Sequence, residues 1–316
     1  MTHALSNIKR LGRLALCGLL AGAMTAAASC AGPGDGEAKK GFRVVASFTP
    51  VYALTLAVAD GAENVTVECM TAQTAGCPHD YQLTPADMQK VESADLLVLN
   101  GAGMEDSFSD KIFSQYPHLP AVESAEGLTL LPEMGEHDHD HEGHGDEENN
   151  SHTWLSLQNA KKQAARISAA LSEYDPANAA VYTANAQRFQ EAADRLDEKY
   201  RPALEALPHR KFITFHAAFA YLAADYGFQV AAVVESTPGT APDPQTLQRL
   251  IEEARAEGIT AIFTEPQYPD STAKVIAEGA NAKIYTLDPL VTGDVDKESY
   301  LAGMEKNFQT LTQALA

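Results

Sequence analysis

The chain has 316 residues, which at about 150 residues per domain favours two domains. Hydrophobic residues make up 45% of it and charged residues 21%, as in ordinary globular proteins, so a collagen-like or wholly disordered chain is excluded. Its 43 acidic residues outnumber its 23 basic ones. The resulting net charge of −20 argues against a nucleic-acid binder, which needs a basic surface against phosphate.

Residues 1–29 have the pattern of a lipoprotein signal peptide. A basic start is followed by an apolar run up to Ala28 that is too short for an ordinary membrane span. The sequence Ala-Ala-Ser-Cys then looks like a lipobox, which predicts Cys30 as the lipid-bearing first residue of the mature chain. Simple secretion is the alternative, and it also places the protein outside the cytoplasm. Residues 30–41 are Gly-rich and polar, and we expect them to form a flexible tether.

Short runs rich in Val and Leu then alternate with helical patterns, which predicts an α/β fold of two lobes, each a mostly parallel sheet covered by helices. The N-terminal lobe covers 42–174, a long linking helix covers 175–207, and the C-terminal lobe covers 208–316. The predicted strands are Arg43–Ser47, Val65–Met70, Asp95–Asn100, Lys211–Phe215, Gln229–Val234, Ile259–Thr264 and Lys283–Leu287. The predicted helices of the lobes are Pro50–Asp60, Pro85–Glu92, Met104–Gln115, Leu157–Tyr174, Ala217–Tyr226, Asp243–Glu257, Pro269–Gly279 and Glu298–Leu315. A ligand is expected in the crevice between the lobes.

Residues 133–151 interrupt this alternation. They contain four histidines and eight acidic residues, with no large apolar side chain besides Met134, and cannot bury enough surface to fold alone. We therefore expect a disordered loop within the N-terminal lobe.

Two cysteines remain in the mature chain after Cys30. Disulfides persist outside the cytoplasm, so a bridge between Cys69 and Cys77 is predicted, and it would stabilise a small loop by roughly 2–3 kcal/mol. A pair of free thiols is the alternative. A third possibility is that Cys77, two residues before His79, contacts a metal.

Four residues stand at the ends of predicted elements and carry metal-binding chemistry. His79 lies between a strand and a helix, and His152 precedes a helix beside the only Trp of the chain. His216 and Asp288 each follow an apolar strand. Imidazole is the commonest metal ligand. Taken singly, each is a weak signal, because a lone loop histidine is more often a solvated residue than a metal ligand and the aspartate could merely cap a turn.

Together, five segments resemble the metal-binding solute-binding lipoproteins of ABC importers, the zinc and manganese receptors. These segments are PHDYQLTPADM, SHTWLSL, TFHAAFAYLAADYGF, FTEPQYP and YTLDPL. The resemblance implies two α/β lobes joined by a long rigid helix, with one metal site in the cleft between them. It places the metal ligands at His79, His152, His216 and Asp288.

The third ligand position separates the two kinds of receptor in this family. Manganese receptors carry Glu there and zinc receptors carry His, so His216 predicts Zn²⁺. Three nitrogens and one oxygen suit tetrahedral zinc, whereas manganese prefers more oxygen ligands. Glu235 and Glu265, at strand ends facing the same cleft, are expected to orient imidazole N–H groups.

Zinc receptors of this family often carry an acidic, histidine-rich insertion at the position of the loop. Its four imidazoles are expected to form a secondary metal loop that collects cations; they belong to His137, His139, His141 and His144. The alternative is a solvated acidic linker that binds metal incidentally.

The resemblance implies an extracytoplasmic, high-affinity zinc receptor that delivers Zn²⁺ to an ABC permease. We expect a monomer, held on the bacterial cell membrane by lipid at Cys30. Four protein ligands leave no position for an activated water, and the sequence has no HExxH, GxSxG or P-loop motif, so an enzyme is not expected. The alternatives are a manganese or iron receptor of the same family, or a lipid-anchored adhesin.

Overall fold

The computed structural model describes residues 41–72, 79, 81–133, 149–234 and 242–316. The chain divides into two units, Met1–Lys39 and Lys40–Ala316, and all the described residues belong to the second. Several predicted features lie outside the described residues: the signal peptide, the lipidation at Cys30, Cys77, Glu235 and the four loop histidines (137, 139, 141 and 144). Within the described part of the chain, no helix is both long and apolar enough to span a bilayer.

The N-terminal lobe contains a parallel sheet of four strands in the order β2-β1-β3-β4. All four residues of the central strand β3 are buried, because helices cover both faces of such a sheet. The strands are β1 (Phe42–Ala46), β2 (Val65–Cys69), β3 (Leu96–Leu99) and β4 (Ala121–Glu123), and the helices are α1 (Thr49–Ala59), α2 (Pro85–Glu92) and α3 (Ser109–Gln115). Strand β4 was not expected, and α3 begins five residues later than predicted, because residues 104–108 form turns that end at Phe108 with a non-helical φ of −141°.

The C-terminal lobe repeats this plan with strands in the order β6-β5-β7-β8, again all parallel. The strands are β5 (Lys211–Thr214), β6 (Gln229–Val233), β7 (Ala261–Thr264) and β8 (Lys283–Thr286). The helices are α6 (Ala220–Asp225), α7 (Pro244–Ala256), α8 (Ser271–Ala280) and α9 (Ser299–Ala314), and the 3-10 turn η4 (Ala217–Phe219) precedes α6. The two parallel α/β sheets confirm the predicted fold class.

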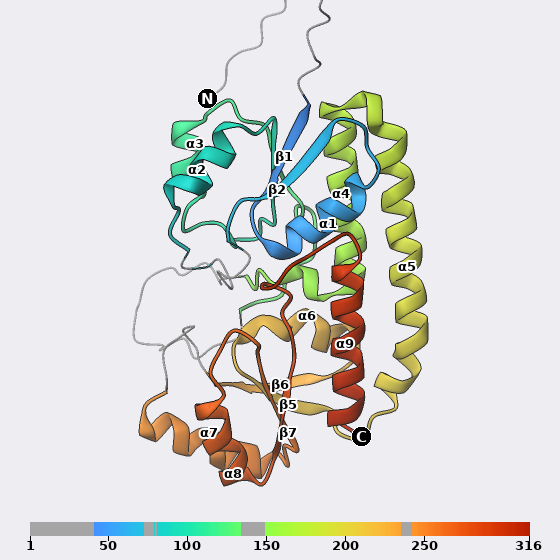
Figure 1. Ribbon diagram of the computed structural model, residues 1–316. Helices are drawn as coiled ribbons and strands as arrows, with labels where there is room; N and C mark the ends of the chain where they lie inside the picture. The colour runs from blue at the N-terminus through green and yellow to red at the C-terminus, as the bar shows by residue number, and fades with distance from the viewer. Residues whose placement is uncertain (1–40, 73–78, 80, 134–148, 235–241) are drawn as a thin grey trace, which may run out of the picture. The chain divides into compact units, whose positions relative to one another are not determined.

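Two long helices connect the sheets. Helix α4 (Leu157–Tyr174) begins at Ser156, whose hydroxyl accepts a hydrogen bond from the backbone N–H of Asn159. The 3-10 turn η3 (Pro176–Asn178) leads into α5 (Ala179–Glu205), whose 27 residues extend over about 40 Å. Helix α5 packs along α4 and α9 (Figure 1). It forms the predicted link between the lobes, although its first turn is the separate η3.

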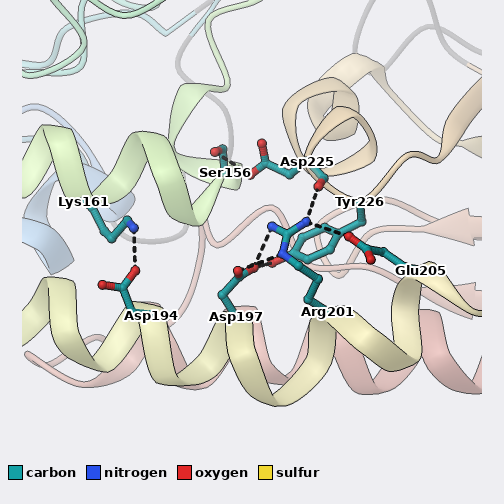
Figure 2. Close-up of polar contacts among 8 residues, drawn as sticks. All are labelled: Ser156, Lys161, Asp194, Asp197, Arg201, Glu205, Asp225 and Tyr226. Carbon is teal, nitrogen blue, oxygen red and sulfur yellow. Dashed lines mark hydrogen bonds and ion pairs between the residues drawn. The ribbon is translucent and has the colours of Figure 1, made fainter.

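A polar cluster joins α4, α5 and α6 (Figure 2). Ser156 Oγ donates to Asp225 Oδ2 at 2.6 Å, and Arg201 Nη1 donates to the backbone oxygen of Asp225 at 2.9 Å. Arg201 also forms a two-pronged ion pair with Asp197, which accepts a further hydrogen bond from the Tyr226 hydroxyl. Burial raises the pKa of Asp225. The cluster therefore fixes the start of α4, and with it the segment just before it, against the C-terminal lobe.

Candidate metal centre

His216 stands where the carboxyl ends of two neighbouring strands meet. It follows β5, and Glu265 follows β7, the adjacent strand in the sheet. Glu265 Oε1 lies 2.5 Å from His216 Nδ1 and accepts a hydrogen bond from the backbone N–H of His216 at 3.2 Å. Gln267 Nε2 donates to the other carboxylate oxygen at 2.8 Å. A carboxylate at Nδ1 selects the Nδ1–H tautomer, so the Nε2 lone pair of His216 is left for a ligand. The contact expected for Glu265 is present.

His152 lies just before the 3-10 turn η2 (Thr153–Leu155) and is buried. Burial lowers the pKa of His152 well below its usual value, and the nearby His216 and His79 lower it further. The imidazole is therefore neutral at physiological pH, which is the form that binds metal. Next to it, the Trp154 indole donates to the backbone oxygen of Pro289 at 2.8 Å.

The structure brings three of the four predicted ligands into ring contact. The ring centroids of His79 and His152 lie 5.1 Å apart, and those of His152 and His216 lie 5.0 Å apart. The Nε2 atoms of His152 and His216 are separated by 3.2 Å. Two nitrogens bound to one tetrahedral zinc ion at 2.0–2.1 Å would be about 3.3 Å apart. The spacing of this pair is thus close to that of two nitrogen ligands of one metal ion.

Asp288, the fourth predicted ligand, follows β8 and is half-buried. Its Oδ1 accepts a hydrogen bond from the backbone N–H of Leu290 at 2.8 Å, and the Asn307 side chain holds its backbone N–H and carbonyl groups. Burial raises the pKa of this carboxyl group. Among the described residues, no three His, Cys, Asp or Glu side chains form a ready-made metal cluster. The Asp288 carboxylate is therefore oriented by its hydrogen bond to Leu290 within the same turn. The next residue, Pro289, is the one that accepts the hydrogen bond from Trp154.

A buried polar network holds the backbone of Ser151, the residue before His152. Asn100 Nδ2 donates to the backbone oxygen of Ser151 at 2.9 Å. The Glu105 carboxylate accepts hydrogen bonds from the Ser47 hydroxyl and from the backbone N–H groups of Asn100 and Gly101. Burial, partly offset by these three donors, raises the pKa of Glu105 to about 7. This network was not anticipated, because nothing in the spacing of these polar residues marks them as neighbours of a histidine 47 or more positions away.

Cys69, at the end of β2, is buried and has no disulfide partner among the described residues, and burial raises the pKa of its thiol to about 11. Its predicted disulfide partner, Cys77, lies outside the described residues, so the bridge stays a prediction. Lys90 Nζ donates to the carbonyl groups of Cys69 and Met70 at 2.7 and 2.8 Å. These bonds fix the carboxyl end of β2.

A family model described as ZnuA, the periplasmic component A of a zinc-uptake complex, matches residues 44–314. The chain belongs to the ZnuA family. It is therefore a solute-binding protein rather than an enzyme, and it is the extracytoplasmic, metal-binding component of an ABC uptake system. In this family, the component delivers its metal to an ABC permease.

Named relatives of this ZnuA-family chain differ in their metal. The iron-binding protein YfeA of Yersinia pestis is 34% identical over 261 residues, which cover 82% of this chain and 80% of YfeA. The zinc-binding lipoprotein AdcA of Streptococcus pneumoniae is 31% identical over 280 residues, covering 85% of this chain but 55% of AdcA, so the chain spans about half of that relative. The structure of FpvC from Pseudomonas aeruginosa in complex with Mn²⁺ aligns with a TM-score of 0.78 and 26% identity, covering 87% of this chain and 98% of that one. The metal bound by this chain is a divalent cation.

Proposed function

We propose that this protein is a zinc receptor that captures Zn²⁺ with high affinity outside the cytoplasm and delivers it to an ABC permease. The ion would bind three imidazoles and one carboxylate, and this ligand set favours zinc over manganese. The proposed ligands are His79, His152, His216 and Asp288. The name of AdcA, a zinc-binding lipoprotein, supports the same metal.

One observation carries this proposal, the 3.2 Å separation of the Nε2 atoms of His152 and His216. Both rings are buried, and Glu265 holds the His216 ring with its Nε2 lone pair free. The His79 ring also lies against His152, with 5.1 Å between the ring centroids, and we infer that it turns to the same ion. We infer that Asp288 completes the shell by turning from the N–H of Leu290 to the ion.

Two further parts of the proposal concern segments outside the described residues. We infer that Cys30 carries the lipid anchor that holds a monomeric receptor at the bacterial cell membrane. The acidic loop histidines would bind additional zinc weakly and raise its concentration near the cleft.

A manganese or iron receptor is the alternative, because YfeA is named for iron and FpvC binds Mn²⁺. Metal analysis of the protein purified without added metal distinguishes the two. We expect about one equivalent of zinc in the wild type and in His118→Ala, a matched control at an exposed histidine, and almost none in His216→Ala. Manganese or iron in the wild type, or zinc retained by His216→Ala, would contradict the proposal.

A further inference from the structure

Asn150 is a fully buried residue two positions before His152. Its Nδ2 donates to the backbone oxygen of Ala217 at 2.7 Å, and its Oδ1 accepts from the backbone N–H of His152 at 3.0 Å. A backbone N–H can only donate and a backbone carbonyl can only accept. The two partners therefore fix which end of the carboxamide is oxygen.

The same oxygen faces the imidazole of His152. Asn150 Oδ1 lies 3.2 Å from His152 Nδ1, and because it is an acceptor, it can bond only to the Nδ1–H tautomer of the ring, which it therefore favours over the Nε2–H tautomer that would donate to His216. The Nε2 lone pair of His152 then points at Nε2 of His216, whose own proton Glu265 holds on Nδ1. Neither Nε2 can donate to the other. Two lone pairs 3.2 Å apart repel, and a cation between them removes the repulsion.

Asn150 also connects the segments of His152 and His216, which are far apart in the sequence. Ala217, which accepts from its Nδ2, directly follows His216 in the chain. Tyr221 of α6 donates its hydroxyl to the backbone oxygen of Asn150 at 2.6 Å. The segment that holds His152 is therefore attached to the same short stretch of the C-terminal lobe that begins with His216.

We propose that Asn150 is a positioning residue of the metal centre, which holds His152 in the Nδ1–H tautomer and ties its ring to the His216 segment. This role rests on the proposed function, because it requires that Nε2 of His152 binds a metal ion. Asn150 does for His152 what Glu265 does for His216, with a neutral amide in place of a carboxylate. Partners that orient metal-bound imidazoles commonly contribute about 10–100-fold to metal affinity.

The test compares Asn150→Leu with Asn178→Leu. Asn178 is a matched control, because its carboxamide also accepts from a backbone N–H and donates to a backbone carbonyl, both of Glu63, and it touches none of the imidazoles. ¹⁵N NMR of the imidazole nitrogens in the metal-free protein reports the tautomer of His152. Competition of the purified protein with a zinc chelator reports the affinity.

In Asn150→Leu we expect His152 to lose its Nδ1–H signature and the zinc affinity to fall by about 10–100-fold, with neither change in Asn178→Leu. Asn150→Asp keeps an oxygen acceptor and should restore the Nδ1–H signature. If Asn150→Leu does not fold, Asn150→Ala gives the same comparison. An unchanged tautomer, or an affinity no lower than that of Asn178→Leu, would overturn the proposal. Failure of the wild type to bind zinc would instead refute the proposed function, while the tautomer in the metal-free protein would still decide the role of Asn150.

Discussion

His152 and His216 are separated by 64 positions in the sequence, yet their Nε2 atoms lie 3.2 Å apart. Each ring is held from its far side by an acceptor at Nδ1, Asn150 for the first and Glu265 for the second. Such a pair is organised before metal arrives, so little reorganisation is needed when an ion binds.

Replacing His216 by Glu tests the choice of metal. The substitution His216→Glu exchanges a nitrogen ligand for oxygen and places a carboxylate beside Glu265, so we expect weaker zinc binding and a smaller ratio of zinc to manganese affinity. Competition titrations with both metals measure that ratio. An unchanged ratio would mean that the third ligand does not determine selectivity.

Glu265 is expected to act through His216. In Glu265→Gln the amide oxygen can still accept from Nδ1, but the negative charge that makes the imidazole a better ligand is gone. We expect zinc affinity to fall by about 10-fold or more, and no change in Glu298→Gln, which alters an exposed glutamate on the surface. Equal affinities of the two variants would show that the carboxylate charge is unimportant.

Glu105 should make stability depend on pH. Its folded pKa of about 7 lies above the usual value of 4.5, chiefly because of burial, with a small contribution from the charge of Glu123. The folded state therefore binds the proton more tightly, and this stabilisation, up to about 3 kcal/mol, is present at low pH and lost as the pH rises from about 4.5 to about 7.

Urea unfolding of the metal-free wild type and of Glu105→Gln at about pH 5 and about pH 8 measures this effect. The glutamine lowers the free energy of unfolding by an amount that does not depend on pH, because its side chain faces two backbone N–H donors and does not titrate. We therefore expect the free energy of unfolding of Glu105→Gln, relative to that of the wild type, to be higher at about pH 8 than at about pH 5. The same difference at both values would show that Glu105 does not titrate in this range.

The acidic loop is expected to be separable from the main site. Deletion of residues 137–146 should leave one tight zinc-binding event and remove the weaker ones, because the four proposed ligands all lie outside this segment. Isothermal titration calorimetry of the deleted and full-length proteins distinguishes the two classes. Disappearance of the tight event would place the main site in the loop.

Much of the fold could be predicted because its elements have strong local patterns. Helix α4 was predicted with its correct bounds, since Ser156 caps its start and Pro176 follows its end. Strand β4 was missed because it has three residues, of which only Val122 is buried. The long linking helix was predicted as one piece, whereas Pro176 begins a separate turn, η3.

The site could be predicted only in part. The ends of β5 and β7 placed His216 near Glu265, because the carboxyl ends of parallel strands meet at one edge of a sheet. The role of Asn150 could not be foreseen, since it acts through backbone groups of an irregular segment that has no periodicity. For Asp288 the strand end gave the position of the residue but not the direction of its carboxylate, which the turn at Leu290 decides.

A crystal of the protein grown with zinc, with anomalous scattering recorded at the zinc edge, tests the central claim most directly. We predict one strong peak about 2.0–2.1 Å from Nε2 of both His152 and His216, with His79 and the Asp288 carboxylate completing a tetrahedron. A peak confined to the acidic loop, or imidazoles that point away from a common ion, would contradict the account.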